Sequence, residues 1–334
     1  MKSTIANRKL ILKLSACAAM FALGLSACGG GGGDSGGGGS SGPSAPSTPV
    51  AITETNAQGV SNEAVSALME TGATEGVTGA AVTESPATPQ KMIKINSALA
   101  KRLGLYLDAP QVVTGVTETY NCSVSGTVTY NDHNSSDQLT ITFNNCSDNP
   151  GETLNGSIAI ANASGTETNF TADVSIDLTF TVTGEPTFSV VGGYNINYSS
   201  SPGTYESNLL SGSRLAFVYG AEVDVLTNFN ISEGVDFTFT PDRFDASSNF
   251  SLASTRLNGG ITVTTTSRFY RWATALYPHQ GSLEVVGANN SRLRLTVLGN
   301  ESAPGNQVRI EVDANGDGTY ELTIETTWAA LAAS

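Results

Sequence analysis

From Gln111 onward, apolar and polar residues alternate along the chain. The clearest run is FTADVSIDLTFTV at 170–182, where every second residue is apolar and the residues between are Thr, Ser or Asp. A period of two residues predicts a β-strand with one buried and one exposed face. About a dozen such runs follow one another, separated by turn residues, so the pattern predicts a mainly β protein built on a large antiparallel meander. Because such a sheet must hide its edges, we expect it to curl into a barrel or half-barrel, or to split into two packed sheets.

Matching apolar residues across each turn predicts the registers of the hairpins, since a slip of one residue would turn every side chain to the other face. The matching pairs Val128 with Leu139, Phe180 with Val190, Val285 with Leu293, and Ile310 with Leu322. A transmembrane β-barrel also has alternating strands, but the runs here are uneven in length and aromatic residues do not recur at their ends.

Two earlier segments have a helical period instead. In Ala57–Glu70, apolar residues recur every four positions, which predicts a weak helix because Gly59 lies within it. A stronger helix is predicted over Thr88–Gly104, with its apolar residues on one face. A helix laid over the apolar face of the sheet explains this second pattern better than an amphipathic helix on a membrane surface does.

The N-terminus has the plan of a secretory signal. Four basic residues precede the apolar run LSACAAMFALGLSA, which is too short for a comfortable membrane span, and Cys28 follows it. Residues 29–49 are rich in Gly, Ser and Pro and predict a flexible tether. We expect a signal peptide at 1–27, a lipidated cysteine and tether at 28–49, a weakly structured linker with a possible short helix at 50–89, and a β-rich domain with an N-terminal helix at 90–334.

The residues Leu25-Ser26-Ala27-Cys28 resemble the lipobox of bacterial lipoproteins, in which the cysteine becomes the lipidated first residue. The resemblance implies a membrane anchor on Cys28 and, because Gly29 and not Asp follows, a place in the cell envelope at the outer membrane. Leu14–Cys17 has the same four letters, but no apolar segment would precede the cut there. The stretches TETNAQGVSNEAV and DANGDGTYE are similar to parts of uncharacterised proteobacterial lipoproteins, a resemblance that implies no particular activity.

The chain is acidic. Its net charge of −14 becomes −18 without the signal, because residues 1–27 hold four basic and no acidic residues. Nucleic acids and anionic lipid surfaces both attract clustered Lys and Arg. The charge therefore predicts no nucleic-acid partner and no membrane contact beyond the lipid anchor.

The two cysteines outside the signal and the anchor are Cys122 and Cys146. In an exported chain they predict one disulfide. The apolar register places Cys122 opposite Asn145, so we expect a one-residue bulge at Asn144–Asn145 that brings the cysteines together.

Catalytic motifs such as G-x-S-x-G, H-E-x-x-H and the Walker loop are missing, and we expect a protein that is not an enzyme. The densest aromatic stretch, RFYRWATALYPHQ, offers Tyr270, Trp272 and His279 as a surface that can stack on a sugar or an apolar ligand. The alternative is that these three residues close one end of the core.

The string DANGDGTYE at 313–321 has the spacing of a calcium loop. Its oxygen-bearing residues are Asp313, Asn315, Asp317, Thr319 and Glu321, and the first three match positions 1, 3 and 5 of such loops. The flanking residues alternate as strands, and Ile324 stands where a bidentate Glu belongs, so an EF-hand is excluded. A plain hairpin turn and a partial cage for a weakly bound structural calcium ion both remain as interpretations.

These observations predict a membrane-anchored, non-enzymatic envelope lipoprotein whose sheet binds an apolar, glycan or protein ligand, or has a structural role. The alternatives are a calcium-assisted surface adhesion module and a glycan hydrolase whose carboxylates only the fold would pair. An apolar concavity would favour a lipid carrier, aromatic residues outside a filled core would favour adhesion, and two inward carboxylates in a cleft would favour the hydrolase.

Overall fold

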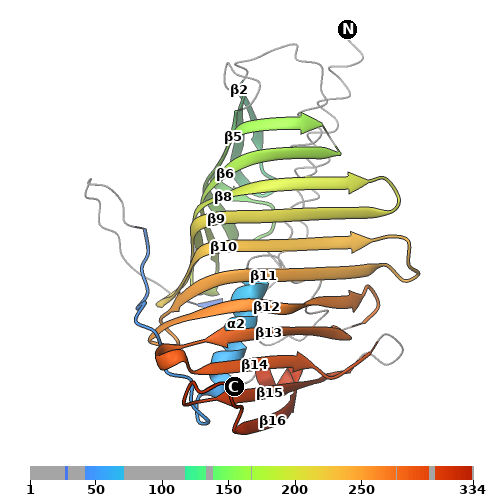
Figure 1. Ribbon diagram of the computed structural model, residues 1–334. Coiled ribbons are helices and arrows are strands. Elements are labelled where there is room, and N and C mark those ends of the chain that lie inside the picture. The colour runs from blue at the N-terminus through green and yellow to red at the C-terminus, as the bar shows by residue number, and fades with distance from the viewer. Residues whose placement is uncertain are drawn as a thin grey trace.

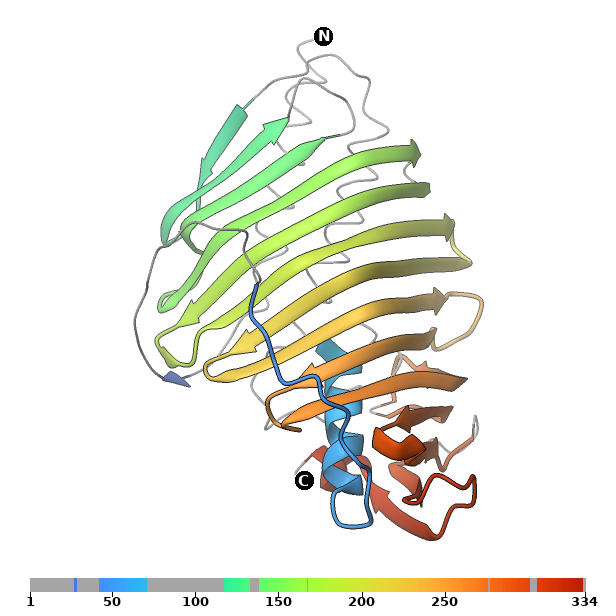
Figure 2. The ribbon, with the colours of Figure 1, turned by 60° about the vertical axis from the view of Figure 1, so that its left-hand side comes forward.

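A computed structural model describes residues 27–28, 42–70, 117–132, 138–166, 168–275, 277–300 and 305–332. Most of the described chain forms one antiparallel sheet of 14 strands, in the order β16-β15-β14-β13-β12-β11-β10-β9-β8-β6-β5-β4-β3-β2. Each strand therefore pairs with its neighbours along the chain, as in a meander. The sheet curls without closing into a barrel, and β2 and β16 are its edges (Figures 1 and 2). The predicted fold class is confirmed, in its form as one open, curled sheet.

The strands lengthen towards the middle of the sheet and shorten again. Their bounds are β2 Thr117–Asn121, β3 Ser125–Asp132, β4 Leu139–Ser147, β5 Glu152–Thr166, β6 Asn169–Val182, β8 Phe188–Ser201, β9 Tyr205–Tyr219, β10 Glu222–Asp236, β11 Arg243–Ser254, β12 Gly259–Trp272, β13 Gln280–Val286, β14 Arg292–Val297, β15 Gln307–Asp313 and β16 Leu322–Thr327. The other elements are α2 Ala57–Glu70, the 3-10 turn η1 Ala288–Asn290, α5 Trp328–Ala332, and the two-residue strands β1 Ala27–Cys28 and β7 Gly184–Glu185, which pair in parallel.

One face of the sheet is apolar and buried, as the alternation predicts. In β6 the buried and more exposed residues alternate over the whole strand. The apolar side chains of β5, β6, β8 and the later strands join one core with those of α2, a core that runs in sequence from Ile52 to Leu331. We call the buried side the inner face and the opposite, polar side the outer face.

Helix α2 lies on the inner face of the C-terminal part of the sheet (Figure 1). It has the bounds that the sequence predicts, and Val60, Ala64 and Leu68 are fully buried in the core. The chain before the helix also belongs to the domain, because Val50 bonds to the backbone of Gly260 and Ala288. A helix this short gains most of its stability from packing, so α2 is a core element and not part of a linker. The predicted helix at 88–104 lies outside the described residues.

The turn geometry decides which predicted registers are right. Val285 pairs with Leu293, as predicted, across the tight turn at η1. Ile310 pairs with Ile324 and Phe180 with Phe188, so both of those predicted registers are wrong by two residues. Both hairpins have longer connections between their strands than the predicted registers require. A slip of two residues nevertheless keeps every side chain on its predicted face of the sheet.

At the N-terminal edge, Cys122 and Cys146 form a disulfide with their Cα atoms 5.5 Å apart. The register of β3 and β4 pairs Val128 with Phe143, so the predicted partner Leu139 is wrong by four residues. The predicted bulge is confirmed. The pairing of β4 slips against both of its neighbours at this point, and Asn145 takes a positive φ of 45°. The extra residue turns Cys146 towards Cys122.

Candidate functional site

The acidic loop at 313–321 connects β15 to β16 and is organised by Asp313. This residue ends β15, and its side chain is 0% exposed. One carboxylate oxygen accepts a hydrogen bond from the backbone N–H of Gly316 at 2.7 Å, and the other accepts one from Gly318 at 2.9 Å. Both glycines have positive φ, 76° and 93°, which lets the backbone fold over the carboxylate.

Two further side chains shape the same loop. Asn315 Oδ1 accepts the N–H of Asp317, and Asp317 Oδ1 accepts the N–H of Thr319, each at 2.8 Å. These are Asx turns, in which a short polar side chain bonds the backbone two residues on. The hydrogen bond from the Thr319 backbone lowers the pKa of Asp317 most, and the bond from the Thr319 hydroxyl lowers it further. The Asp317 carboxyl therefore stays ionised in mildly acidic solution.

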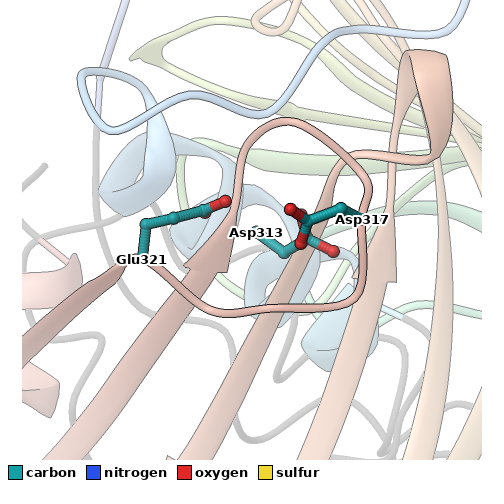
Figure 3. Close-up of side chains that lie close together, drawn as sticks. All are labelled: Asp313, Asp317 and Glu321. Atoms are coloured by element: carbon teal, nitrogen blue, oxygen red, sulfur yellow. The ribbon is translucent and has the colours of Figure 1, made fainter.

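Glu321 closes the ring of carboxylates from the far side of the loop (Figure 3). Its oxygens accept the N–H of Ala314 at 3.2 Å and the amide of Asn315 at 2.6 Å. One oxygen each from Asp313, Asp317 and Glu321 lie within 4.8 Å of one another. Calcium binds oxygen at 2.3–2.6 Å, so two ligands on opposite sides of one ion are about 5 Å apart. The spacing of these three oxygens is compatible with three ligands of one calcium ion.

The structure brings together the carboxylates that the sequence predicts and gives the other two residues supporting roles. Asn315 bonds to Glu321 and Asp317, and Thr319 bonds to Asp317 through its N–H. Strand residues flank the loop, and Ile324 pairs with Ile310 within the sheet. The geometry is that of a partial cage with three carboxylates, without the helices of an EF-hand.

The three predicted aromatic residues also come together. The ring of His279 stacks on Trp272, with centroids 5.1 Å apart, and on Tyr270 at 6.5 Å. The guanidinium of Arg243 lies 4.9 Å from the centre of the Tyr270 ring and 4.1 Å from that of Phe239. We call Phe239, Arg243, Tyr270, Trp272 and His279 the aromatic cluster.

Tyr270 and Trp272 of the aromatic cluster lie on the outer face. Phe269 belongs to the core, so its neighbour Tyr270 points to the opposite side of β12, and Trp272 follows Tyr270 by two residues. Both rings are half-buried, whereas His279 is 1% exposed. Tyr270 and Trp272 are thus partly accessible to a ligand, whereas His279, which stacks on both rings, is buried.

A polar network adjoins the cluster on the same face. Arg268 bonds to Asp245 and, at 2.7 Å, to the hydroxyl of Ser232, while the Tyr205 hydroxyl reaches Asp245 at 3.4 Å. Burial, and then the charge of Asp245, raises the pKa of Tyr205. These residues and Arg243 were not predicted from the sequence, because they lie on four different strands and only the sheet register brings them together. The available signal was the alternation of β11, which places Arg243 and Asp245 on its polar side.

The rest of the outer face carries cross-strand polar pairs. Asp173 accepts hydrogen bonds from Asn162 at 2.6 Å and from Asn195 at 3.1 Å. Both bonds lower the pKa of Asp173, and the bond from Asn162 has the larger effect. Hydroxyl pairs such as Thr119 with Thr129 repeat the pattern on other strands. This face offers hydrogen-bonding groups along the whole sheet.

Comparison with known proteins finds no similarity to argue from. No protein-family model, no curated protein and no solved structure matches the chain. Within the described residues, no helix is long and apolar enough to cross a membrane.

Proposed function

We propose that this chain is a non-catalytic lipoprotein of the bacterial cell envelope, anchored at the outer membrane through lipid on Cys28, which binds a glycan with the outer face of its sheet. The resemblance to the lipobox and the glycine-rich tether support the anchor. The division of the sheet into a buried apolar face and an accessible polar face supports the binding surface.

The observation that carries the proposal is the position of Tyr270 and Trp272 outside the core. A sheet that carried a lipid would present its apolar residues to the ligand, whereas here Leu178, Val190 and Ile196 are buried. The outer face combines aromatic rings with arginines, carboxylates and amides. Sugars have apolar ring faces and hydroxyl edges, and such a surface can contact both.

The anchor is tested by replacing the lipidated cysteine. We expect Cys28→Ser to move the protein from the membrane fraction to the soluble fraction and to remove the mass of the acyl chains. Cys17→Ser, in the other copy of the same four letters, is the matched control and leaves the protein in membranes. If the Cys28→Ser protein stayed in the membrane fraction and still carried the mass of the acyl chains, lipidation of Cys28 would be contradicted.

Glycan binding is tested with the soluble protein from residue 42 onward on immobilised polysaccharides, including peptidoglycan. We expect at least one polysaccharide to retain the protein, and affinity to fall about fivefold or more in Trp272→Ala, since a stacked aromatic ring contributes on the order of 1 kcal/mol or more. Tyr120→Ala, which removes a ring at the far end of the sheet, is the control. Equal retention by both variants, or none by the unchanged protein, would rule out this surface.

A calcium-assisted adhesion module is the second candidate, and the carboxylates of Asp313, Asp317 and Glu321 favour it. Calcium on this loop would stiffen the last hairpin, with affinity at the weak extracellular end, about 10⁻⁴–10⁻³ M. Calorimetry checks it, with Asp317→Asn expected to abolish the heat of binding. Asp177→Asn, an exposed acid on another strand, is the control. No heat from the unchanged protein at millimolar calcium would leave the loop as a plain turn.

A further inference from the structure

A second group of acidic side chains lies on the inner face, where α2 meets the sheet. Glu63 of α2 is 4% exposed, in a helix whose other buried residues, Ser61 apart, are apolar. Opposite it lie Asp224 near the start of β10, also buried, and Ser254 at the end of β11. This group is separate from the acidic loop at 313–321 and from the aromatic cluster.

The contacts join the helix to the sheet. Glu63 Oε1 accepts a hydrogen bond from the Ser254 hydroxyl at 2.7 Å and from Arg256 Nε at 3.1 Å. The same guanidinium bonds to Asp224 Oδ2 at 2.6 Å. Arg256 therefore bridges a carboxyl of the helix and a carboxyl of the sheet, and the two acids face each other across it.

The charges in this contact do not balance. Among the described residues, Glu63, Asp224 and Glu222 face Arg256, and Glu222 lies 3.9 Å away with a half-exposed side chain. The two buried acids thus share one positive charge, and Asp224 Oδ1 is buried with no hydrogen-bond partner. Two carboxylates that share a buried site do not both ionise readily, so one of them retains a proton.

Glu63 is the acid that retains it. Burial first, and then the charge of Asp224, raises the pKa of Glu63 from 4.5 to about 7, against the opposing effect of Arg256. The raised pKa of Glu63 agrees with the geometry, because the Glu63 side chain is buried and Asp224 on the sheet is a second acid beside it.

We propose that α2 is held to the sheet by a proton shared within the Glu63–Asp224 pair, so that the helix docks tightly in mildly acidic surroundings and more loosely in mildly alkaline ones. Losing the proton leaves two negative charges in a buried contact with one arginine. The site is thus a pH-sensitive contact between the helix that follows the tether and the sheet.

The direction of the effect follows from the two states of Glu63. Its pKa is near 4.5 when the helix is undocked and about 7 when it is docked, so the docked state binds the proton more tightly. The extra stability is fully present below pH 4.5 and is lost as the pH rises through 7. Between pH 6 and pH 8 the undocked population should rise up to about tenfold.

Hydrogen exchange of the α2 amides, corrected for the intrinsic effect of pH, measures this change. We expect protection of α2 to fall by up to about tenfold from pH 6 to pH 8, with β6 and β8 as internal references that do not change. In Glu63→Gln, which mimics the protonated acid, the dependence should disappear. Glu222→Gln, which removes the exposed acid on the same arginine, should retain it.

Asp224→Asn gives a second, independent test, which also serves if Glu63→Gln does not fold. Removing the neighbouring charge should weaken the dependence on pH, because Glu63 then ionises more easily. A dependence that is the same in the unchanged protein, Glu63→Gln and Asp224→Asn would overturn the proposal. So would equal protection of α2 at pH 6 and pH 8 in the unchanged protein.

Discussion

Asp313 shows how one buried acid can organise a whole loop. Each of its oxygens accepts a backbone N–H, which fixes the loop before any ion is bound. Asp317, by contrast, is exposed and contributes to the loop through a single local turn. If the loop binds calcium as proposed, the two acids have separable roles, Asp313 in building the loop and Asp317 in holding the ion.

Urea unfolding in the presence of a chelator should separate those roles. We expect Asp313→Ala to lower the free energy of unfolding by about 1–3 kcal/mol, since it removes two hydrogen bonds to a charged group. Asp317→Asn should leave the chelated protein close to unchanged and remove only the stabilisation that calcium adds. If Asp313→Ala were as stable as the unchanged protein, the loop would not depend on this side chain.

Individual site residues were predictable from sequence where the signal is local. The acids of the loop follow from spacing alone, and so does the proximity of Tyr270 and Trp272, which lie two residues apart on one strand. The face that these rings occupy depends on which side of the sheet is covered. Glu63 was not predicted, because a single acid in a weak helix has no periodic signal. Its partners are more than 150 residues away in the chain.

At the scale of elements, turns limit what can be predicted from sequence. The alternation gives strands and faces, and the hairpin at η1 has the predicted register because its turn is tight. The hairpin of β15 and β16 differs by two residues because side chains in the loop, Asp313 above all, hold open a longer connection. Apolar matching has no information about such bonds.

Helix α2 offers a matched pair of substitutions. Leu68 is fully buried, so we expect Leu68→Ala to destabilise the protein by about 2–5 kcal/mol. Gly59 has no atom within 4 Å of an added Cβ, so Gly59→Ala should stabilise it by about 0.5–1 kcal/mol. Denaturant unfolding of both variants checks the pair. A neutral Leu68→Ala would mean that α2 contributes little to the core.

At the scale of the whole molecule, each described strand of the sheet contacts mainly its immediate neighbours. Damage at one edge should therefore stay local, as it does in repeat proteins. The disulfide lies at the β2 edge of the sheet, at the opposite end of the strand order from β15 and its acidic loop.

Replacing both Cys122 and Cys146 by Ser tests this locality. We expect a loss of about 3 kcal/mol in the strands that the disulfide closes, seen as faster hydrogen exchange in β2–β4. Strands β6 to β12 should exchange as before. Faster exchange over the entire sheet would show instead that the domain unfolds as one cooperative unit.

The strand order also bears on how the chain assembles if it is exported from its N-terminus, as the signal predicts. Each strand can pair with the one that emerged just before it, so the sheet can grow hairpin by hairpin during translocation. Helix α2 and the residues before it cannot follow that order, because their contacts lie on later strands, from β9 to β15. Helix α2, although it comes early in the chain, would thus reach its place only after these later strands have formed.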